Sequence, residues 1–304
     1  MGVLGDPADT LDAAVIGRQT SLSTFGSRTR ANLASTIIII ALVPLAIMAG
    51  LPFIWIYISS FKTDMEIFSP TLVWFPSTFY YDGYIYVWEE TALVRGYANS
   101  ILVSGASVTL SVFTSVLAGY LFAKKDFWGK TPLFIFVLST LMVPFFAIFI
   151  PSFVVYSKFL NLKDTYIALI LPHMFTAFGI LITRQFLHSI PNELIDSATV
   201  DGAGDWRVLW HIILPLSRSI LAAIAIIQFL GVFNEFLWPL VMTDRAELYT
   251  LPVVLRRVYG QGSAMAGSNR ILAAGVVAVT PIVIFFLIFQ RQIVKGISLT
   301  GMKA

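Results

Sequence analysis

The 304-residue chain contains no cysteine and only three histidines. Without cysteine there can be no disulfide, no thiolate-bound haem and no cysteine zinc finger. His173, His188 and His211 are also too few, and too far apart in the sequence, for a multi-histidine metal centre. We therefore expect no metal site in this chain.

Charge is scarce as well, since charged residues make up 12% of the chain and the net charge is only +3. No run of five like charges occurs, so nucleic acid is not an expected partner. A phosphate-binding loop is missing too, because that motif requires a lysine after its second glycine and the nearest match continues from Gly267 as Ser268 and Asn269. The chain itself is expected to bind no cofactor and to be no enzyme.

Hydrophobic residues are abundant, at 57% of the chain, which is more than one soluble core of this size can hide. A bilayer core of ~30 Å requires roughly 17 to 25 apolar residues as a helix. Five long stretches carry no charge at all, and a sixth is interrupted only by Glu235. The sequence therefore predicts an all-α integral membrane protein with six transmembrane helices, at about 35–60, 97–122, 132–156, 165–187, 219–242 and 270–290.

Residues 31–304 are expected to form this transmembrane domain, and residues 1–30 a cytoplasmic tail. The first apolar stretch is much longer than the roughly 7 to 15 residues of a signal-peptide core, so we interpret it as a retained span. Prolines inside several spans are expected to kink them, namely Pro44, Pro52, Pro144, Pro172 and Pro239.

Lysine and arginine indicate the orientation. With a cytoplasmic N-terminus, twelve of these residues lie inside and eight outside, a modest bias of the right sign. The short loop 124–130, with the sequence KKDFWGK, decides the assignment because its three lysines lie close to membrane ends. Both termini and the loop 188–218 are then predicted to be cytoplasmic, in the inner membrane of a bacterium or archaeon.

The longest external loop, residues 62–96, is rich in tryptophan and tyrosine. Aromatic side chains gather at membrane interfaces, and they are also favoured in protein interfaces. The loop is therefore either part of an aromatic belt or a docking face for an external partner.

The cytoplasmic loop 188–218 is polar and contains two glycines. Pro191 is expected at the start of a short helix, Gly202 and Gly204 would end it with positive φ, and Asp205 would cap a second helix. Along the second helix an apolar stripe is predicted at helical spacing, formed by Trp206, Leu209, Trp210 and Ile213.

The two helices of this loop differ in what they offer. Asp196, Ser197 and Ala198 on the first helix are small, which allows another surface to approach its backbone closely. The tryptophan stripe of the second helix is expected to anchor on the underside of the membrane domain. The alternative is that the whole loop is an amphipathic segment resting on the bilayer surface.

The segment DSATVDGAGDWRVLWHIILP, beginning at Asp196, resembles the EAA loop of carbohydrate-type inner-membrane permeases of ABC importers, the MalG-like family. Other stretches resemble the family in the same order, namely SFKTDMEIF, NSILVS, FGILITRQFLHSIPNEL, FNEFLWPL and the C-terminal FQRQIVKGISLTGMKA. The resemblance covers roughly residue 50 to the end. Two positions depart from the pattern, because Asp196 replaces a glutamate and Ser219 a common proline.

The resemblance implies the type I (MetI-like) importer permease fold and a chain that works in a complex. Its partners would be a second, related permease subunit, two ATPase subunits that hold ATP and magnesium, an extracytoplasmic sugar-binding protein and membrane lipid. In this family the EAA loop docks on an ATPase subunit. The residues that match it here are Glu193, Leu194, Asp196, Ser197, Ala198, Asp201, Gly202, Ala203 and Pro215.

One stretch of the fifth predicted span is polar. Asn234 and Glu235 would line a sugar path, with Phe233 or Trp238 stacking on a sugar ring. An ionisable group in hydrocarbon costs ~2.5 to 3.5 kcal/mol, so Glu235 is expected to face protein or water. The alternative is a hydrogen bond from Glu235 that locks two helices together. His173 is interpreted as a buried histidine whose hydrogen bonds are satisfied.

Together these features predict the permease subunit of an ATP-driven importer that moves a carbohydrate by alternating access. One alternative keeps this architecture and changes the solute to glycerol phosphate or another polar molecule. The other is an ATP-independent secondary transporter. That class favours paired charges or inverted repeats at mid-membrane, whereas the sequence offers a lone Glu235 and no evident repeat.

Overall fold

The computed structural model describes residues 36, 38–261 and 267–301. The predicted tail 1–30 lies outside them. Within the described residues, the regular elements are helical, as expected. The chain divides into two compact units, residues 1–58 and 59–304. The first contributes one apolar helix, Ile38–Ser59, which is continuous through Pro44 and Pro52 and whose 22 residues span about 33 Å at 1.5 Å per residue.

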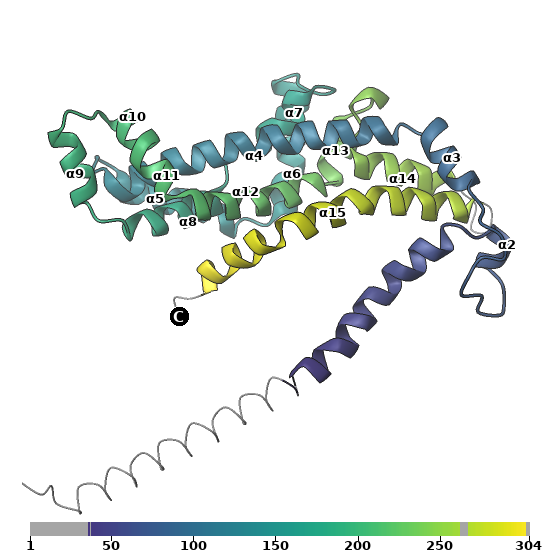
Figure 1. Ribbon diagram of the computed structural model, residues 1–304. Helices are drawn as coiled ribbons and strands as arrows, with labels where there is room; N and C mark the ends of the chain where they lie inside the picture. The colour runs from purple at the N-terminus through teal and green to yellow at the C-terminus, as the bar shows by residue number, and fades with distance from the viewer. Residues whose placement is uncertain (1–35, 37, 262–266, 302–304) are drawn as a thin grey trace, which may run out of the picture. The chain divides into compact units, whose positions relative to one another are not determined.

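The second unit is built around one long helix, α4, Leu93–Lys124 (Figure 1). It packs against α8 (Ala177–His188), α12 (Arg218–Phe233) and α14 (Leu251–Gln261). A row of buried serines on α4 allows these helices to approach closely, namely Ser100, Ser104, Ser107, Ser111 and Ser115. Their burial indicates that these serines are packing residues.

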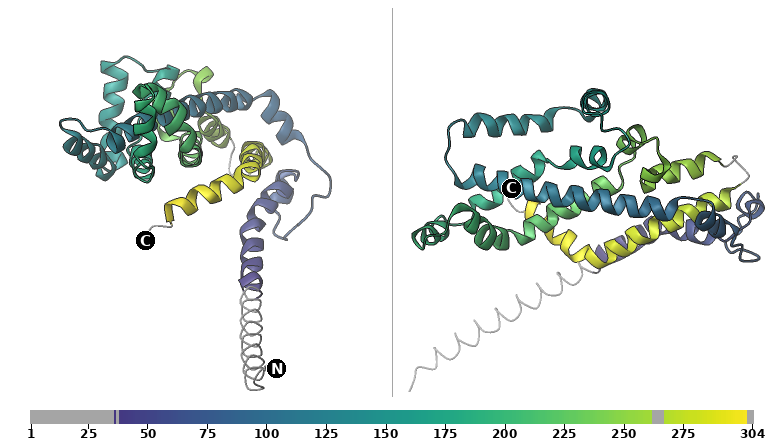
Figure 2. Two further views of the ribbon diagram at one scale, coloured as in Figure 1. Left: turned by 60° about the vertical axis from the view of Figure 1, so that its left-hand side comes forward. Right: turned by 90° about the horizontal axis from the view of Figure 1, so that it is seen from above.

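The remaining elements complete the bundle. Their order is α2 (Asp64–Ile67), α3 (Asp82–Glu89), α5 (Lys130–Ser139), η1 (Thr140–Met142), α6 (Phe145–Val154), η2 (Val155–Phe159), α7 (Tyr166–Ile170), η3 (Leu171–His173), α13 (Leu237–Met242), η5 (Ala246–Leu248) and α15 (Ser268–Gly301). α15 runs beside α12 and α14 and meets α3 at its beginning (Figures 1 and 2). The contact between α3 and α15 joins two segments that are far apart in the sequence.

Several predicted spans are broken rather than straight. The third is bent by 101° where Pro144 precedes α6, and the fourth by 41° between η3 and α8. A further bend of 78° separates the segment ending at Leu216 from α12. Among the described residues, two helices are long and apolar enough to cross a membrane alone, or up to five if each bent pair is one span. The count of six stays a prediction.

Side chains from neighbouring helices bind the carbonyl groups at the bend of the fourth span. The Trp238 indole N–H donates to the Ala168 carbonyl at 2.8 Å, and the Thr114 hydroxyl to that of Met174 at 2.7 Å. The Gln228 amide donates to the His173 carbonyl at 3.4 Å. In lipid an unpaired carbonyl costs several kcal/mol, so these three contacts stabilise the bend.

Close contact between α4 and α8 depends on glycine. A Cβ placed on Gly119 would lie 2.7 Å from Cγ2 and 2.8 Å from Cβ of Thr183, whereas one placed on Gly105, on the same helix, would meet nothing within 4 Å. We predict that Gly119→Ala destabilises the protein by about 1 to 3 kcal/mol, the usual cost of overpacking. Gly105→Ala is the matched control and should leave stability unchanged or slightly raised.

Thermal unfolding of the purified protein in detergent measures both variants. Equal melting temperatures for the two variants would show that α4 and α8 do not approach as described.

Candidate functional site

The polar loop 188–218 lies at one end of the bundle, opposite α3 along α4 (Figure 1). Its first helix is α9, Glu193–Val200, and Asn192 is the N-cap. The helix therefore begins later than predicted, since Pro191 was expected at its first position. The Asn192 carbonyl accepts from the backbone N–H groups of Ile195 and Asp196, at 2.8 and 2.9 Å. Pro191 therefore lies two residues before the helix.

The helix ends in a Schellman turn built on Gly202. The Ala203 N–H donates to the Ala198 carbonyl at 2.9 Å, and the Gly202 N–H to the Thr199 carbonyl at 3.0 Å. Gly202 has a φ of +83°, as predicted. Gly204 does not, because its φ is −74° and it caps the next helix, which corrects the prediction that Asp205 is that cap.

α9 has one face packed on the bundle and one face open. Ile195 is buried, and Ala198 and Ala203 are half-buried against the same apolar cluster as Leu187 and Val208. The other face carries most of the predicted contact residues, and the exposed ones are Glu193, Leu194, Asp196, Ser197, Asp201 and Gly202. Pro215, farther along the loop, is half-buried.

Two adjacent lysines fix the loop to the end of α4. Lys124 Nζ donates to the Ile190 carbonyl at 2.6 Å and to Asn192 Oδ1 at 2.7 Å, just before α9. Lys125 forms an ion pair with Asp205 at the start of α10, Asp205–Val208, and this contact raises the pKa of Lys125. In the sequence these lysines indicate only the orientation of the chain, and no local pattern signals that they hold both helices of the loop.

The second half of the loop differs from the predicted stripe. After α10 the chain widens into a π-helix, η4, Leu209–Ile213, followed by the short α11, Leu214–Leu216. The added residue in the turn shifts the buried face to Val208, Leu209 and Ile213. Trp206 and Trp210 are 59% and 50% exposed, so the prediction that they anchor on this chain is wrong.

The polar stretch of the fifth predicted span is a break in the helix. α12 ends at Phe233, α13 begins at Leu237, and Glu235 lies between them. Its carboxylate is 2.7 Å from Nε2 of His173, at the end of η3, and both side chains are about four-fifths buried, with 17% and 20% exposed. Glu235 is thus not alone, and His173 is satisfied, as expected.

The other three residues of this predicted site differ in exposure. Asn234 is exposed and donates to the Leu230 carbonyl of its own helix at 2.8 Å. Phe233 is buried in a cluster with Tyr97, and Trp238 is buried between Phe149 and Tyr156. Both rings are buried within this chain, so Asn234 is the accessible residue of the predicted site.

Comparison with known proteins identifies the family. Residues 115–299 match the family model of the binding-protein-dependent transport system inner membrane component. The chain is 36% identical over 265 residues to the arabinooligosaccharides transport system permease protein AraQ of Halalkalibacterium halodurans, covering 85% of this chain and 93% of AraQ. It is 29% identical over 247 residues to the sn-glycerol-3-phosphate transport system permease protein UgpE of Yersinia pestis, covering 79% and 88%.

A solved structure has the same fold. It is a bacterial ABC transporter involved in the import of the acidic polysaccharide alginate, one chain of which is similar to this chain with a TM-score of 0.76 and 20% identity. The match covers 86% of this chain and 96% of that one. The chain belongs to the inner-membrane permeases of binding-protein-dependent ABC importers.

Proposed function

We propose that this permease carries an oligosaccharide across the cytoplasmic membrane, driven by ATPase subunits that dock on α9. The carbohydrate assignment is supported by the 36% identity to the arabinooligosaccharide permease, which exceeds the 29% identity to the glycerol phosphate permease. The observation that carries the docking assignment is the loop itself, which is rigidly held on its inner face and open on its outer face.

The outer face of α9 suits a protein groove. Leu194 and Val200 are 46% and 87% exposed, although the helix lies in a polar loop. Ser197 and Asp196 are short enough to let another backbone approach. Exposed apolar side chains on a polar loop favour a surface that another protein covers.

Energy considerations favour shape over charge as the source of coupling. An exposed pair between Asp196 and an arginine of the ATPase contributes ~0 to 1 kcal/mol. Moving a two-state equilibrium from mostly one state to mostly the other requires about 5.5 kcal/mol. The apolar fit around Leu194 and the stiff turn at Gly202 must therefore supply most of the coupling.

The remaining subunits follow from the family. A second permease would complete the translocation path, and an extracytoplasmic binding protein would deliver the sugar. ATP and magnesium would be bound by the ATPase subunits. With the N- and C-termini cytoplasmic, α9 faces the compartment that holds ATP.

The break at residues 234–236 is our candidate for the sugar path in this chain. Its amide and carboxylate can accept hydrogen bonds from sugar hydroxyls, and Asn234 is exposed. The contact between Glu235 and His173 gives the carboxylate a second task, because it joins the breaks of two spans. The two roles are compatible, since one carboxylate has two oxygens.

Substitutions on the outer face of α9 test the docking assignment. Asp196→Lys reverses the charge of a small acidic side chain. Gly202→Trp adds a large side chain on the outer face, where a Cβ meets nothing within 4 Å, and it also strains the turn because Gly202 has a φ of +83°. We expect both variants to insert into the membrane and to lose most sugar-dependent ATP hydrolysis, because the groove no longer fits.

Gly202→Ala is the control, since it introduces the same backbone strain at this turn without a large side chain. Copurification of the ATPase subunits and sugar-stimulated ATP turnover in proteoliposomes are measured for each variant. Normal turnover in both loop variants would rule out docking at α9.

The solute is tested with the purified transporter and its binding protein. We expect arabinose-containing or related neutral oligosaccharides to stimulate ATP turnover several-fold and glycerol 3-phosphate to leave it unchanged. The opposite response would transfer the assignment to glycerol phosphate. Solute movement by the permease without its ATPase would instead support a secondary transporter.

A pair of alanine variants separates the two roles of the helix break. Asn234→Ala should reduce transport without changing the melting temperature, because its amide contacts only its own helix. Glu235→Ala should reduce both, because it leaves His173 without its partner, at a cost of ~1 to 3 kcal/mol. Unimpaired transport by Asn234→Ala at all sugar concentrations would remove this residue from the path.

A further inference from the structure

The segment after the first helix folds into a closed loop, residues 61–80, which we name the stapled loop. The Tyr80 N–H donates to the Phe61 carbonyl at 2.9 Å and closes it. The Ser77 N–H donates to Glu66 Oε1, also at 2.9 Å, and the Ser77 hydroxyl donates to the same oxygen. A third cross-link runs from Lys62 Nζ to the Val73 carbonyl at 2.6 Å. The loop therefore has a fixed shape.

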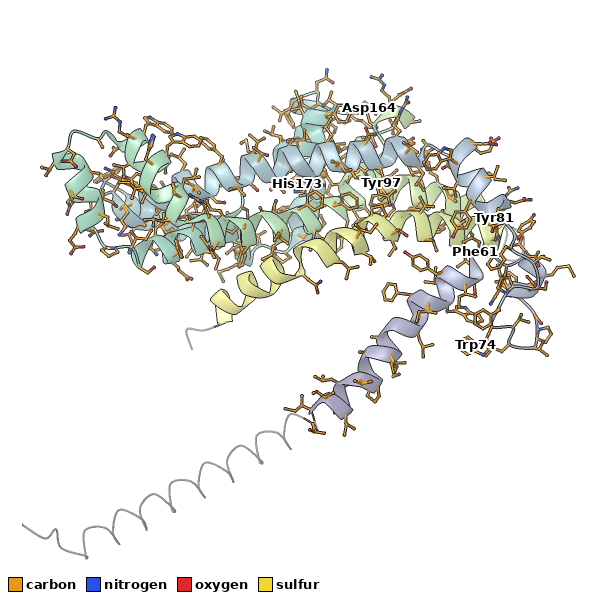
Figure 3. All side chains as sticks on the ribbon, viewed as in Figure 1. Phe61, Trp74, Tyr81, Tyr97, Asp164 and His173 are labelled. Carbon is orange, nitrogen blue, oxygen red and sulfur yellow. The ribbon has the colours of Figure 1, made fainter. Side chains whose placement is uncertain are left out.

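Aromatic rings reinforce the base of this loop. The ring of Phe61 stacks on Tyr84 of α3 with centroids 5.0 Å apart, and it meets Phe79 and Tyr81 edge-on at 5.8 and 5.7 Å. Figure 3 shows Phe61 and Tyr81 close together, with Trp74 farther out on the loop. The base thus packs on the bundle while the outer part projects.

The outer part of the stapled loop is apolar and uncharged. No charged residue occurs between Glu66 and Asp82. Leu72, Phe75 and Phe79 are 67%, 72% and 65% exposed, and Trp74 is 47% exposed. Lys62, the one lysine of the loop, is fully buried beneath it, and burial lowers its pKa. Exposed apolar side chains of this size indicate that something other than water covers them.

The position of the loop favours lipid over a soluble protein. Phe61, where the loop closes, lies two residues beyond Ser59, the end of the apolar helix, and so within about 7 Å of it at 3.3 to 3.6 Å per residue. With the first helix spanning the bilayer, that distance would put the base at the level of the lipid headgroups. Apart from its serines and threonines, the segment 67–81 consists of apolar and aromatic residues, and none of its side chains is charged. Such a mixture of tryptophan, tyrosine and aliphatic side chains suits the headgroup boundary.

We propose that the stapled loop is a membrane anchor that inserts Leu72, Trp74 and Phe75 into the headgroup and acyl boundary of the bilayer, next to the end of the first span. Its hydrogen bonds hold the apolar tip at one depth. This anchor fixes the level of α3 in the membrane. It goes beyond the transport function and does not depend on the nature of the solute.

The absence of native cysteine allows a direct test. Leu72→Cys and Phe75→Cys, each as the sole cysteine, are labelled with a nitroxide in the complete transporter and reconstituted into phospholipid vesicles. Collision with oxygen, which dissolves in lipid, is compared with collision with a water-soluble nickel complex. We expect the nitroxides at residues 72 and 75 to collide more often with oxygen than with the nickel complex. Glu89→Cys, at the exposed end of α3, is the control and should be dominated by nickel.

Two results would overturn the anchor. Nickel access at residues 72 and 75 equal to that at residue 89 would place the tip in water. Loss of access to both reagents only after the sugar-loaded binding protein is added would assign the loop to protein docking. Both results are independent of ATP turnover, so they leave the transport assignment unaffected.

A second variant tests the staple. Hydrogen bonds from Ser77 and Thr63 hold the pKa of Glu66 at about 2, below its ordinary value of 4.5. The staple is therefore fully present above pH 4.5 and is lost as the pH falls through about 2. Glu66→Ala should remove it at neutral pH, so that the label at residue 72 becomes more mobile and its oxygen preference falls. An unchanged spectrum would show that Glu66 does not position the tip.

Discussion

Every backbone group of this chain that lies in lipid must find its partner within the protein, and this constraint explains the most unusual part of the bundle. The fourth predicted span is bent by 41°, yet the carbonyls of Ala168, His173 and Met174 each accept a hydrogen bond from another helix. The donors lie on α13, α12 and α4. Bent spans are therefore possible here only because side chains on three other elements are already in place.

The sequence predicts well what depends on composition and period, and poorly what depends on contacts between distant segments. Apolar runs predicted the helices, and Gly202 predicted the turn after α9 because only glycine adopts a φ of +83° without strain. The prediction that the tryptophans pack on this chain was wrong because the π-helix at Leu209–Ile213 changes the helical period. The predicted stripe assumed the spacing of a regular α-helix. The pairing of His173 with Glu235 joins residues 62 positions apart in the chain, and no local pattern signals it.

The same distinction applies to the candidate coupling site. The resemblance located α9, and its small outer residues are visible in the sequence. What makes the loop mechanically useful is its attachment, which local patterns do not show. Lys124 and Lys125 are consecutive, yet one holds the residues before α9 and the other the start of α10. Because both lysines end the same helix, the loop is fixed to α4 at two points on either side of the turn.

Two points of attachment matter because a single one would act as a hinge. A force applied to the outer face of α9 would rotate the loop about one contact, whereas two contacts and the buried side chain of Ile195 resist rotation. The displacement then passes to α4, which packs against α8, α12 and α14 along its length. Close-packed interiors transmit strain rather than absorb it. If an ATPase docks on α9 as proposed, a push on the loop would therefore move the helices that flank His173 and Glu235, and the loop and the polar break would be parts of one mechanical path.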